Sequence, residues 1–243
     1  MKPKKSLGQN FLIDLNVAHR IVDAISPLTT DTVVEIGPGK GILTKILAGR
    51  VEYLICIEMD DFLSQNLKSK LNATAKFKII NADALKIDIS DVIPLSTQYK
   101  LIGNLPYNVA SPIIRHYLTM DNKPSFITVM LQKEVADLIA AKPGKMGYLS
   151  VEFQLRSTVE KLFTVHPSVF KPAPKVKSTV ITMKPHEKSK IIAGSESEFL
   201  TLVRAGFSAP RKQIHNCLQH SLELSKDLIW DILKLAGIPI VGR

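Results

Sequence analysis

TVVEIGPGKGILTKIL, residues 32–47, joins an apolar run to a helical pattern through three closely spaced glycines. The run at 32–36 has the length of a buried strand, and 42–47 continues with the apolar spacing of a short helix. A glycine-rich turn between a first strand and a first helix lets a ligand touch bare backbone at the edge of a parallel sheet. This segment predicts an α/β fold with a nucleotide-type site where the strands end.

Apolar runs and amphipathic stretches keep alternating beyond this turn, as they do in a parallel sheet flanked by helices. Strands are predicted at 32–36, 53–58, 77–81, 100–103, 126–131, 149–155 and 178–183. Helices are predicted at 42–47, 60–71, 109–118, 132–140, 197–207, 211–220 and 226–236. The polar segment Pro185–Lys190 predicts a domain boundary near Lys184. We expect a Rossmann-like domain at 1–184 and a small helical domain at 185–243.

The net charge of +10 indicates an affinity for polyanions, of which nucleic acid is the most common inside cells. Residues 141–180 hold seven basic side chains against two acidic ones, whereas a merely solvated face usually mixes the signs. Cys56 and Cys217 lie in separate apolar patterns and are expected to be unpaired thiols of a cytoplasmic protein. No apolar run reaches the roughly 20 residues of a membrane span, so no membrane partner is expected.

The spacing of the glycines limits the nucleotide that the turn can serve. A dinucleotide fingerprint requires a third glycine where Ile42 stands, and the glycine-lysine-serine or -threonine of a P-loop is absent as well. Glu35, just before the glycines, would repel a phosphate but suits a ligand that carries an ammonium and a sulfonium group.

Three acidic residues end three successive predicted strands: Glu35, Glu58 and Asp83. Glu58 stands 21 residues after Gly37, where an acid accepts hydrogen bonds from both ribose hydroxyls. Asp83 is placed to accept a hydrogen bond from an adenine amino group. Any one of them is also explained as an ordinary solvent-facing acid, but together they favour S-adenosylmethionine. S-adenosylhomocysteine would be the product, and Gly37 and Gly39 would give backbone contacts.

The predicted strand at 100–103 runs into Asn104-Leu105-Pro106-Tyr107. The N6 amino group of adenine is a poor nucleophile because its lone pair is delocalised into the ring. The Asn104 side-chain oxygen and the Leu105 carbonyl can accept its hydrogen bonds and aim the lone pair at a methyl donor. Pro106 stiffens the turn, and the Tyr107 ring can stack on the base. The tetrad therefore predicts amine methylation by positioning, without a strong base.

A proline-braced loop at 169–176 offers a second ring, Phe170, for which stacking on the flipped base is favoured over simple anchoring of the loop. The neighbouring Lys171, Lys175 and Lys177 are expected to hold phosphates. The sequence shows no zinc-ligand spacing and no nucleophile elbow, so no metal is expected.

Seven motifs in a fixed order carry a resemblance to a known family. They are Gln9-Asn10-Phe11-Leu12-x-Asp14, Glu35-Ile36-Gly37-Pro38-Gly39-x-Gly41-x-Leu43-Thr44, Ile57-Glu58-x-Asp60, Asn81-Ala82-Asp83-Ala84, Asn104-Leu105-Pro106-Tyr107, Phe170-x-Pro172-x-Pro174-x-Val176-x-Ser178 and Ala205-Gly206-Phe207-Ser208-x-x-Arg211-Lys212. Over nearly its whole length the chain resembles the ribosomal RNA adenine dimethyltransferases, most closely the bacterial type that acts on the small subunit. The resemblance implies a Rossmann-like class I S-adenosylmethionine methyltransferase sheet. It also implies N6-dimethylation of two adjacent adenosines in a hairpin loop near the 3′ end of small-subunit rRNA.

The resemblance implies residue roles that the patterns do not indicate. Cofactor contacts would come from Asn10, Leu12, Gly37, Glu58, Asp83 and Asn104, and rRNA contacts from Arg211 and Lys212. The partner would be rRNA in an assembling small subunit, and a monomer is expected. Two departures concern the C-terminal domain: Pro210 stands where the family more often has a polar or basic residue, and relatives usually continue beyond Arg243 with another helix. That domain is therefore expected to be short.

Two alternative functions remain open from the sequence. One is another adenine N6-methyltransferase, acting on large-subunit rRNA in antibiotic resistance or on DNA, because such enzymes share the Asn104–Tyr107 chemistry. The other is a ribosome-assembly factor without essential catalysis. The intact Asn104, Pro106 and Tyr107 argue against a loss of activity.

Overall fold

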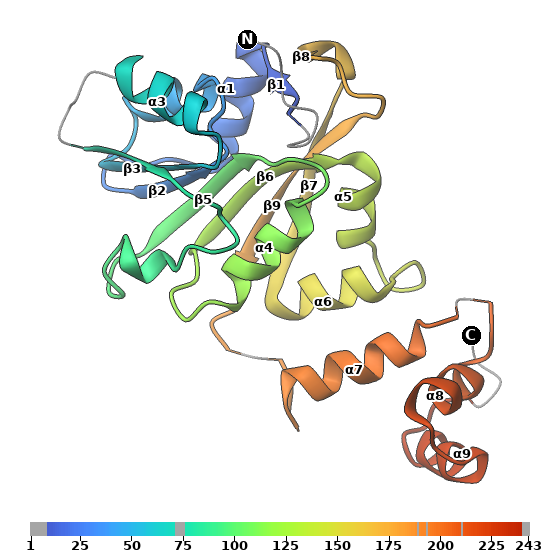
Figure 1. Ribbon diagram of the computed structural model, residues 1–243. Helices are drawn as coiled ribbons and strands as arrows, with labels where there is room; N and C mark the ends of the chain where they lie inside the picture. Colours follow the sequence, from blue (N-terminus) through green and yellow to red (C-terminus); the bar gives the residue numbers. More distant parts are fainter. Residues whose placement is uncertain (1–8, 71–75, 189, 193, 210, 240–243) are drawn as a thin grey trace. The chain divides into compact units, whose positions relative to one another are not determined.

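A computed structural model describes residues 9–70, 76–188, 190–192, 194–209 and 211–239, and within them a seven-stranded sheet organises the fold (Figure 1). Its parallel strands are β2 (Thr32–Ile36), β3 (Tyr53–Glu58), β4 (Phe77–Asn81), β5 (Tyr99–Asn104) and β6 (Phe126–Gln132). β9 (Ser178–Pro185) is antiparallel to both β6 and the edge strand β7 (Ser157–Val165). The order across the sheet is β4-β3-β2-β5-β6-β9-β7.

The strand order reverses at β2. The chain leaves β2 toward β3 and β4, and then returns to place β5 on the other side of β2, so Val34 is paired with Ile55 on one side and Leu101 on the other. Such a reversal leaves a crevice at the carboxyl ends of the strands, where ligands of α/β proteins bind. Gly103 allows the close approach there, since a Cβ at this position would lie 2.7 Å from the Ile36 carbonyl oxygen.

Helices cover both faces of the sheet, which explains why its central strands are apolar on both sides. One face carries α1 (Leu15–Ala24), α2 (Ile42–Leu47) and α3 (Asp61–Lys70), whose buried side chains join the strands in one apolar cluster. The other face carries α4 (Ala110–Thr119) and α5 (Lys133–Ile139), drawn in front of the strands in Figure 1. Two 3₁₀ turns, Ile89–Asp91 and Pro167–Val169, complete this unit.

A separate two-stranded sheet ties the beginning of the described chain to a much later segment. β1 (Phe11–Leu12) is antiparallel to β8 (Phe170–Lys171), with Leu12 opposite Phe170 and Phe11 opposite Lys171. The Ile13 N–H also donates to the Val169 carbonyl at 2.9 Å. The residues just before α1 are thereby fixed by contacts some 160 positions away along the sequence.

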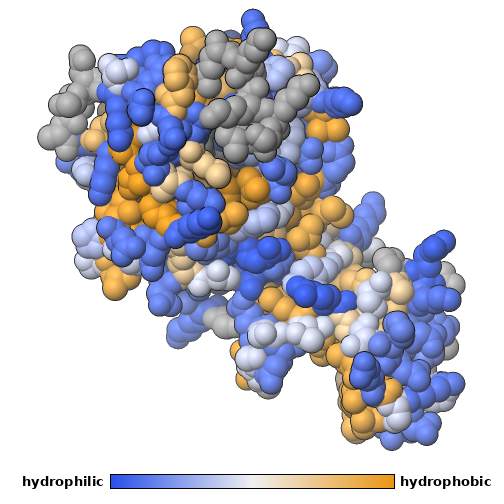
Figure 2. All heavy atoms as spheres, in the orientation of Figure 1, coloured by the Kyte–Doolittle hydropathy of each residue, from blue (hydrophilic) through white to orange (hydrophobic). Residues whose placement is uncertain are grey.

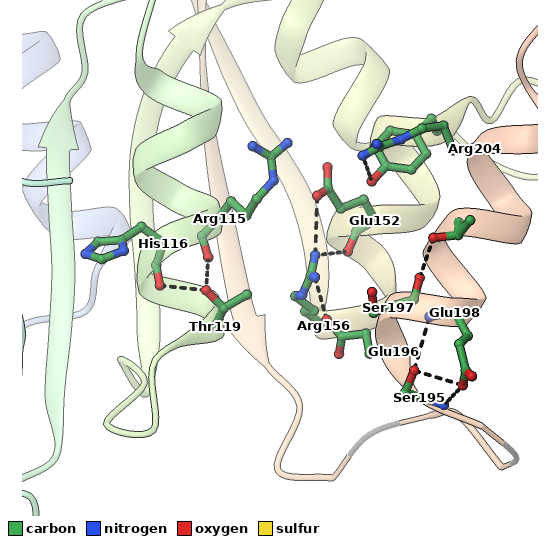
Figure 3. A network of polar contacts seen from close by, with 12 residues as sticks. Arg115, His116, Thr119, Glu152, Arg156, Ser195, Glu196, Ser197, Glu198 and Arg204 are labelled. Atoms are coloured by element: carbon green, nitrogen blue, oxygen red, sulfur yellow. Dashed lines mark hydrogen bonds and ion pairs between the residues drawn. The ribbon is translucent and has the colours of Figure 1, made fainter. Parts of the chain in front are cut away.

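Residues 141–156 and the described residues from Glu187 onward form a second compact unit. It contains α6 (Tyr148–Arg156), α7 (Glu196–Gly206), α8 (Ile214–Leu222) and α9 (Lys226–Leu235). Its small core consists of Ala205, Leu218, Ile229 and Leu233. Figure 3 shows Arg156 paired with Glu152 on its own helix and with Glu196 at the start of α7. α9 also exposes the apolar side chains of Leu228, Ile232 and Leu235. Figure 2 shows orange surface in the region where Figure 1 draws α8 and α9.

The prediction of a strand at 149–155 is wrong, because this segment is the helix α6. Apolar residues at every second position suggested a strand. The buried Glu152, however, lies 3.6 Å from the Arg156 guanidinium four residues later, and a helix brings such a pair together whereas a strand would hold it about 13 Å apart. α6 also belongs to the second unit, whereas the sequence assigned everything up to Lys184 to the first domain. The strand β7 and the helix α1 were not predicted.

The other predicted strands and helices are present, with ends that differ by up to three residues. The largest difference is in α8, which begins at Ile214 rather than at Arg211. The predicted end of the α3 helix at Leu71 and the two C-terminal departures, at Pro210 and after Arg243, lie outside the described residues.

Candidate functional site

A cavity of about 330 Å³ lies at the carboxyl ends of β2, β3, β4 and β5, next to the reversal of strand order. Its size suits a nucleoside-sized ligand. The predicted site residues that line it are Asn10, Leu12, Glu35, Gly37, Gly39, Glu58, Asp83, Asn104, Leu105, Pro106 and Tyr107. The fold therefore brings together residues from five separate segments of the sequence.

The glycine turn after β2 forms the floor of this cavity with exposed backbone. Gly37 and Gly39 have φ angles of +65° and +58°, a region that L side chains rarely adopt. A Cβ on Gly39 would also lie 3.2 Å from the Phe11 ring, which packs over the turn. The Lys40 ammonium lies 4.7 Å from the centre of the same ring, on its face. Phe11 thus holds the turn in place from the β1 side.

Glu58, at the end of β3, is nearly buried and is held by two backbone donors. One carboxylate oxygen accepts from the Gly39 N–H at 3.0 Å, and the other accepts from the Asp60 N–H at 2.9 Å. Burial raises the pKa of Glu58, and these two hydrogen bonds act in the opposite direction. Each oxygen keeps a further lone pair, so the carboxylate can still accept hydrogen bonds from a diol in the cavity.

Glu35 lines the cavity although its side chain is only 1% exposed. Burial raises the pKa of Glu35 to about 7. The Thr44 and Cys56 side chains act in the opposite direction, and the Cys56 thiol lies with its Sγ 3.6 Å from Oε2 of Glu35. No basic side chain influences its pKa within the described part of the chain. A buried acid without a counterion is electrostatically suited to a cationic ligand.

Asp83 follows β4 and completes the row of acids. Its side chain accepts from the Leu85 N–H at 3.0 Å, which fixes the turn after the strand. The neighbouring Asn81 side chain donates to the Glu58 carbonyl at 2.9 Å, so the ends of β3 and β4 are linked. Glu35, Glu58 and Asp83 therefore line one cavity from three adjacent strands, as their positions after the strands predict.

Asn104 ends β5 on the opposite wall, and its orientation is set by a distant residue. Its amide nitrogen donates to the Asn10 carbonyl at 3.2 Å. Because a carbonyl can only accept, the nitrogen must face Asn10, and the side-chain oxygen must point elsewhere as an acceptor. Leu105 is buried, and the Pro106 carbonyl accepts from the Val109 N–H at 3.2 Å, which closes the turn into α4. Tyr107 shares a 2.7 Å hydrogen bond with Ser178.

Asn10 and Leu12 line the cavity from residues 9–14, the segment before α1, which we call the strap. Spacing alone did not indicate them, because a two-residue strand has no periodicity to detect. The available signal was Asp14, which caps α1 by accepting from the Val17 N–H at 2.9 Å and so marks where the strap ends.

Phe170 lies apart from the other predicted catalytic residues, contrary to its expected place in the base pocket. Its ring is only 4% exposed and packs in the apolar cluster beneath β1 and β8, and it does not line the cavity. In this structure the ring anchors the loop and offers no face for stacking. A sheet position opposite Leu12 explains this burial, because it directs the side chain into the core.

The predicted RNA-binding residues are all exposed, as phosphate contacts require. Lys171 ends β8, and Lys175 and Lys177 lie on the loop between β8 and β9, all in the first unit. Arg211 and Lys212 lie just before α8 in the second unit. Among the described residues no group of acids, histidines and cysteines is arranged to hold a metal ion, and none of the helices there is long and apolar enough to span a bilayer.

Comparison with known proteins agrees with this geometry. Residues 1–230 match the family described as ribosomal RNA adenine dimethylase. A protein of Geobacter metallireducens named Ribosomal RNA small subunit methyltransferase A is 39% identical over 245 residues, covering 98% of this chain and 88% of that protein. A protein of the same name from Alkaliphilus oremlandii is 40% identical, with coverages of 98% and 85%.

Solved structures show the same fold. A dimethyladenosine transferase from Plasmodium falciparum is 25% identical with a TM-score of 0.76, over 96% of this chain and 84% of that one. The 23S rRNA methyltransferase ErmE is 24% identical with a TM-score of 0.75, over 96% and 93%. The similarity confirms the expected class I methyltransferase sheet.

Proposed function

The chain belongs to the ribosomal RNA adenine dimethylase family, and we propose that it dimethylates N6 of two adjacent adenosines in a hairpin loop near the 3′ end of small-subunit rRNA. Its class of activity is that of an rRNA adenine N6-dimethyltransferase. One observation carries the assignment to particular residues. The Asn104 amide nitrogen is bonded to the Asn10 carbonyl, which leaves its oxygen as an acceptor in a cavity whose other wall is acidic.

S-adenosylmethionine fits the residues that are present. Glu35 is buried beside the cavity, and no basic side chain of the described segments influences its pKa, so a cationic ligand would supply a compensating charge. Glu58 would accept hydrogen bonds from the ribose hydroxyls, Asp83 would accept one from the adenine amino group, and Asn10 and Leu12 would close the site from the strap. When bound, the cofactor supplies a methyl group on a positively charged sulfur, which becomes a neutral thioether when the methyl group is transferred.

The base side of the site works by positioning. The Asn104 oxygen and the Leu105 carbonyl would accept both N6 hydrogens of a flipped adenine and turn its lone pair toward the methyl donor. Tyr107 would support the face of the base, and stacking of this kind contributes about 1–3 kcal/mol. The C–S bond would break as the C–N bond forms, and N6 would then release one proton to water. Because the positive charge is shared between sulfur and N6 in the transition state, a preorganised site suffices without a strong base.

A transfer assay with labelled cofactor tests the substrate class. We expect label in unmethylated small subunits, recovered as dimethyladenosine, and little in large-subunit rRNA or duplex DNA. Label confined to either of the latter would reject the proposed substrate. The relatives at 36–40% identity are named for the small subunit, which favours this choice over a resistance-type or DNA enzyme. A catalytically silent assembly factor is disfavoured by the complete Asn104–Tyr107 tetrad.

The substrate would be rRNA in an assembling small subunit, met by the protein as a monomer in the cytoplasm. Lys171, Lys175 and Lys177 would hold phosphates next to the base pocket, and Arg211 and Lys212 would do so on the second unit. Their exposure supports this proposal, because phosphate contacts are made by side chains that reach solvent.

A further inference from the structure

The phenol of Tyr107 is fastened to a residue outside the catalytic tetrad. Its hydroxyl shares a hydrogen bond of 2.7 Å with the Ser178 hydroxyl. Tyr107 is partly buried and lines the cavity, whereas Ser178 is fully buried and does not line it. A tyrosine ring attached to its backbone at one end and bonded at the other has little freedom to rotate away. The bond therefore fixes the face that the ring presents to the cavity.

Ser178 is a rigid anchor because it lies inside the sheet. It is the first residue of β9 and is paired with Gln132 of β6 on one side and Val165 of β7 on the other. The preceding residue is also held, since the Lys177 carbonyl accepts from the Lys133 N–H at 2.9 Å. Displacement of the Ser178 backbone would require these neighbouring contacts to break, so the origin of its side chain is fixed.

The loop between β8 and β9 is thus attached at both ends to residues proposed to hold the adenine. At its end, Ser178 holds Tyr107. At its beginning, β8 pairs with β1, directly after Asn10, whose carbonyl holds the Asn104 amide. The exposed lysines of the loop lie between these two attachments. The segment expected to contact phosphates is therefore mechanically connected to both sides of the base pocket.

We propose that Ser178 is a positioning residue, which sets the Tyr107 ring in the orientation that receives the flipped adenine; the inference rests on the proposed function. Removal of its hydroxyl takes away the partner that the described residues give the phenol in a partly buried site, and such a group turns toward water to regain a hydrogen bond. The ring would leave its place against the base. Cofactor binding would not change, because neither hydroxyl belongs to the acid-lined wall.

The test compares Ser178→Ala, Tyr107→Phe and the double variant in methylation of unmethylated small subunits. Each single variant is expected to lower kcat/KM for the RNA by about tenfold, a barrier change of about 1.4 kcal/mol. The double variant should be no slower than the slower single one, because both changes remove the same bond. The cofactor Kd, measured by calorimetry, should stay within twofold of wild type in all three.

Thr179→Val is the matched control, because it removes a buried hydroxyl from the next residue of β9. That hydroxyl contacts Thr164 at 3.3 Å and does not contact Tyr107. The control should lose comparable thermal stability and keep kcat/KM within twofold of wild type. Tyr107→Phe retains the ring and leaves β9 intact, so it tests the bond even if Ser178→Ala does not fold.

The outcomes separate this inference from the proposed function. A wild-type protein that does not methylate small subunits contradicts the function itself. An active wild type with Ser178→Ala or Tyr107→Phe within twofold of it overturns the inference alone. Losses that multiply in the double variant overturn it too, since they would show two independent effects.

Discussion

The two walls of the cavity are built in different ways. The proposed cofactor wall consists of the glycine turn and the acids Glu35, Glu58 and Asp83, and its key contact joins Gly39 to Glu58 across 19 residues. The proposed base wall consists of Asn104–Tyr107, and its contacts reach Asn10 across 94 residues and Ser178 across 71. Local strand and turn chemistry therefore shapes the first wall, whereas long-range packing aims the side chains of the second. Changes on the two walls should affect different measured quantities.

Asn104→Ala should have the largest effect and should act on turnover. It removes the acceptor proposed to hold N6, and the loss of one preorganised polar group at a transition state typically costs about 100-fold in kcat. Calorimetry should find cofactor affinity reduced by no more than about threefold. Asn66→Ala, on α3, is the control and should leave both quantities unchanged. Turnover near wild type would remove Asn104 from the reaction.

Glu58→Ala should instead act on cofactor affinity. It removes the proposed ribose contacts and leaves the Gly39 and Asp60 N–H groups without their present acceptor. The loss of hydrogen bonds between the ribose hydroxyls and a charged carboxylate should weaken cofactor binding roughly 30-fold, as measured by calorimetry. The exposed Glu52, paired with Lys76 on the surface, gives the matched control Glu52→Ala. An unchanged Kd in Glu58→Ala would contradict the ribose assignment.

Glu35→Gln should change the pH dependence of cofactor binding. Burial raises the pKa of Glu35 from 4.5 to about 7, so the carboxyl is mostly protonated below that pH. A cationic ligand that binds there must release this proton. Wild-type affinity should rise relative to the variant between about pH 6 and 8, by up to about tenfold per pH unit below the pKa. The comparison cancels any titration of the ligand itself. Parallel pH profiles would show that the carboxyl does not face the cationic groups.

Glu35→Gln should have the opposite effect on the pH dependence of folding stability in the protein without ligand. A carboxyl whose pKa is raised on folding stabilises the folded state below pH 4.5, and that stability is lost as the pH rises through about 7. Thermal unfolding should therefore show wild type losing stability relative to Glu35→Gln across this range.

The joint substitution Lys175→Ala and Lys177→Ala should give the smallest effect, on RNA affinity alone. Removal of two phosphate contacts should weaken binding by about threefold at physiological salt and reduce the salt slope by about 0.7 per lysine. Filter binding over a salt series measures both. Lys123→Ala, another exposed lysine of the first unit, is the control. An unchanged slope would mean that the loop is not a phosphate surface.

Prediction from the sequence succeeded best where neighbours in the chain carry the information. The glycine turn and the acids after the strands were placed correctly, because parallel strands end at one edge and their loops must meet there. It failed at α6, where alternating apolar residues imitate a strand and the Glu152–Arg156 pair reveals the helix. It also misplaced Phe170, since a loop position gives no sign of the partner strand that buries it.

Residue types and their local spacing were enough to predict the sheet, the row of acids at its edge and the Asn104–Tyr107 tetrad. These features depend on residue type and on spacing over a few tens of positions, so local sequence patterns are sufficient to predict them. Packing between distant segments makes Asn10 orient the Asn104 amide, makes Ser178 hold Tyr107, and places Phe170 in the core. Each of these joins segments that are distant in the chain. Contacts between distant segments form only after the intervening strands have packed, so no local sequence pattern could predict them.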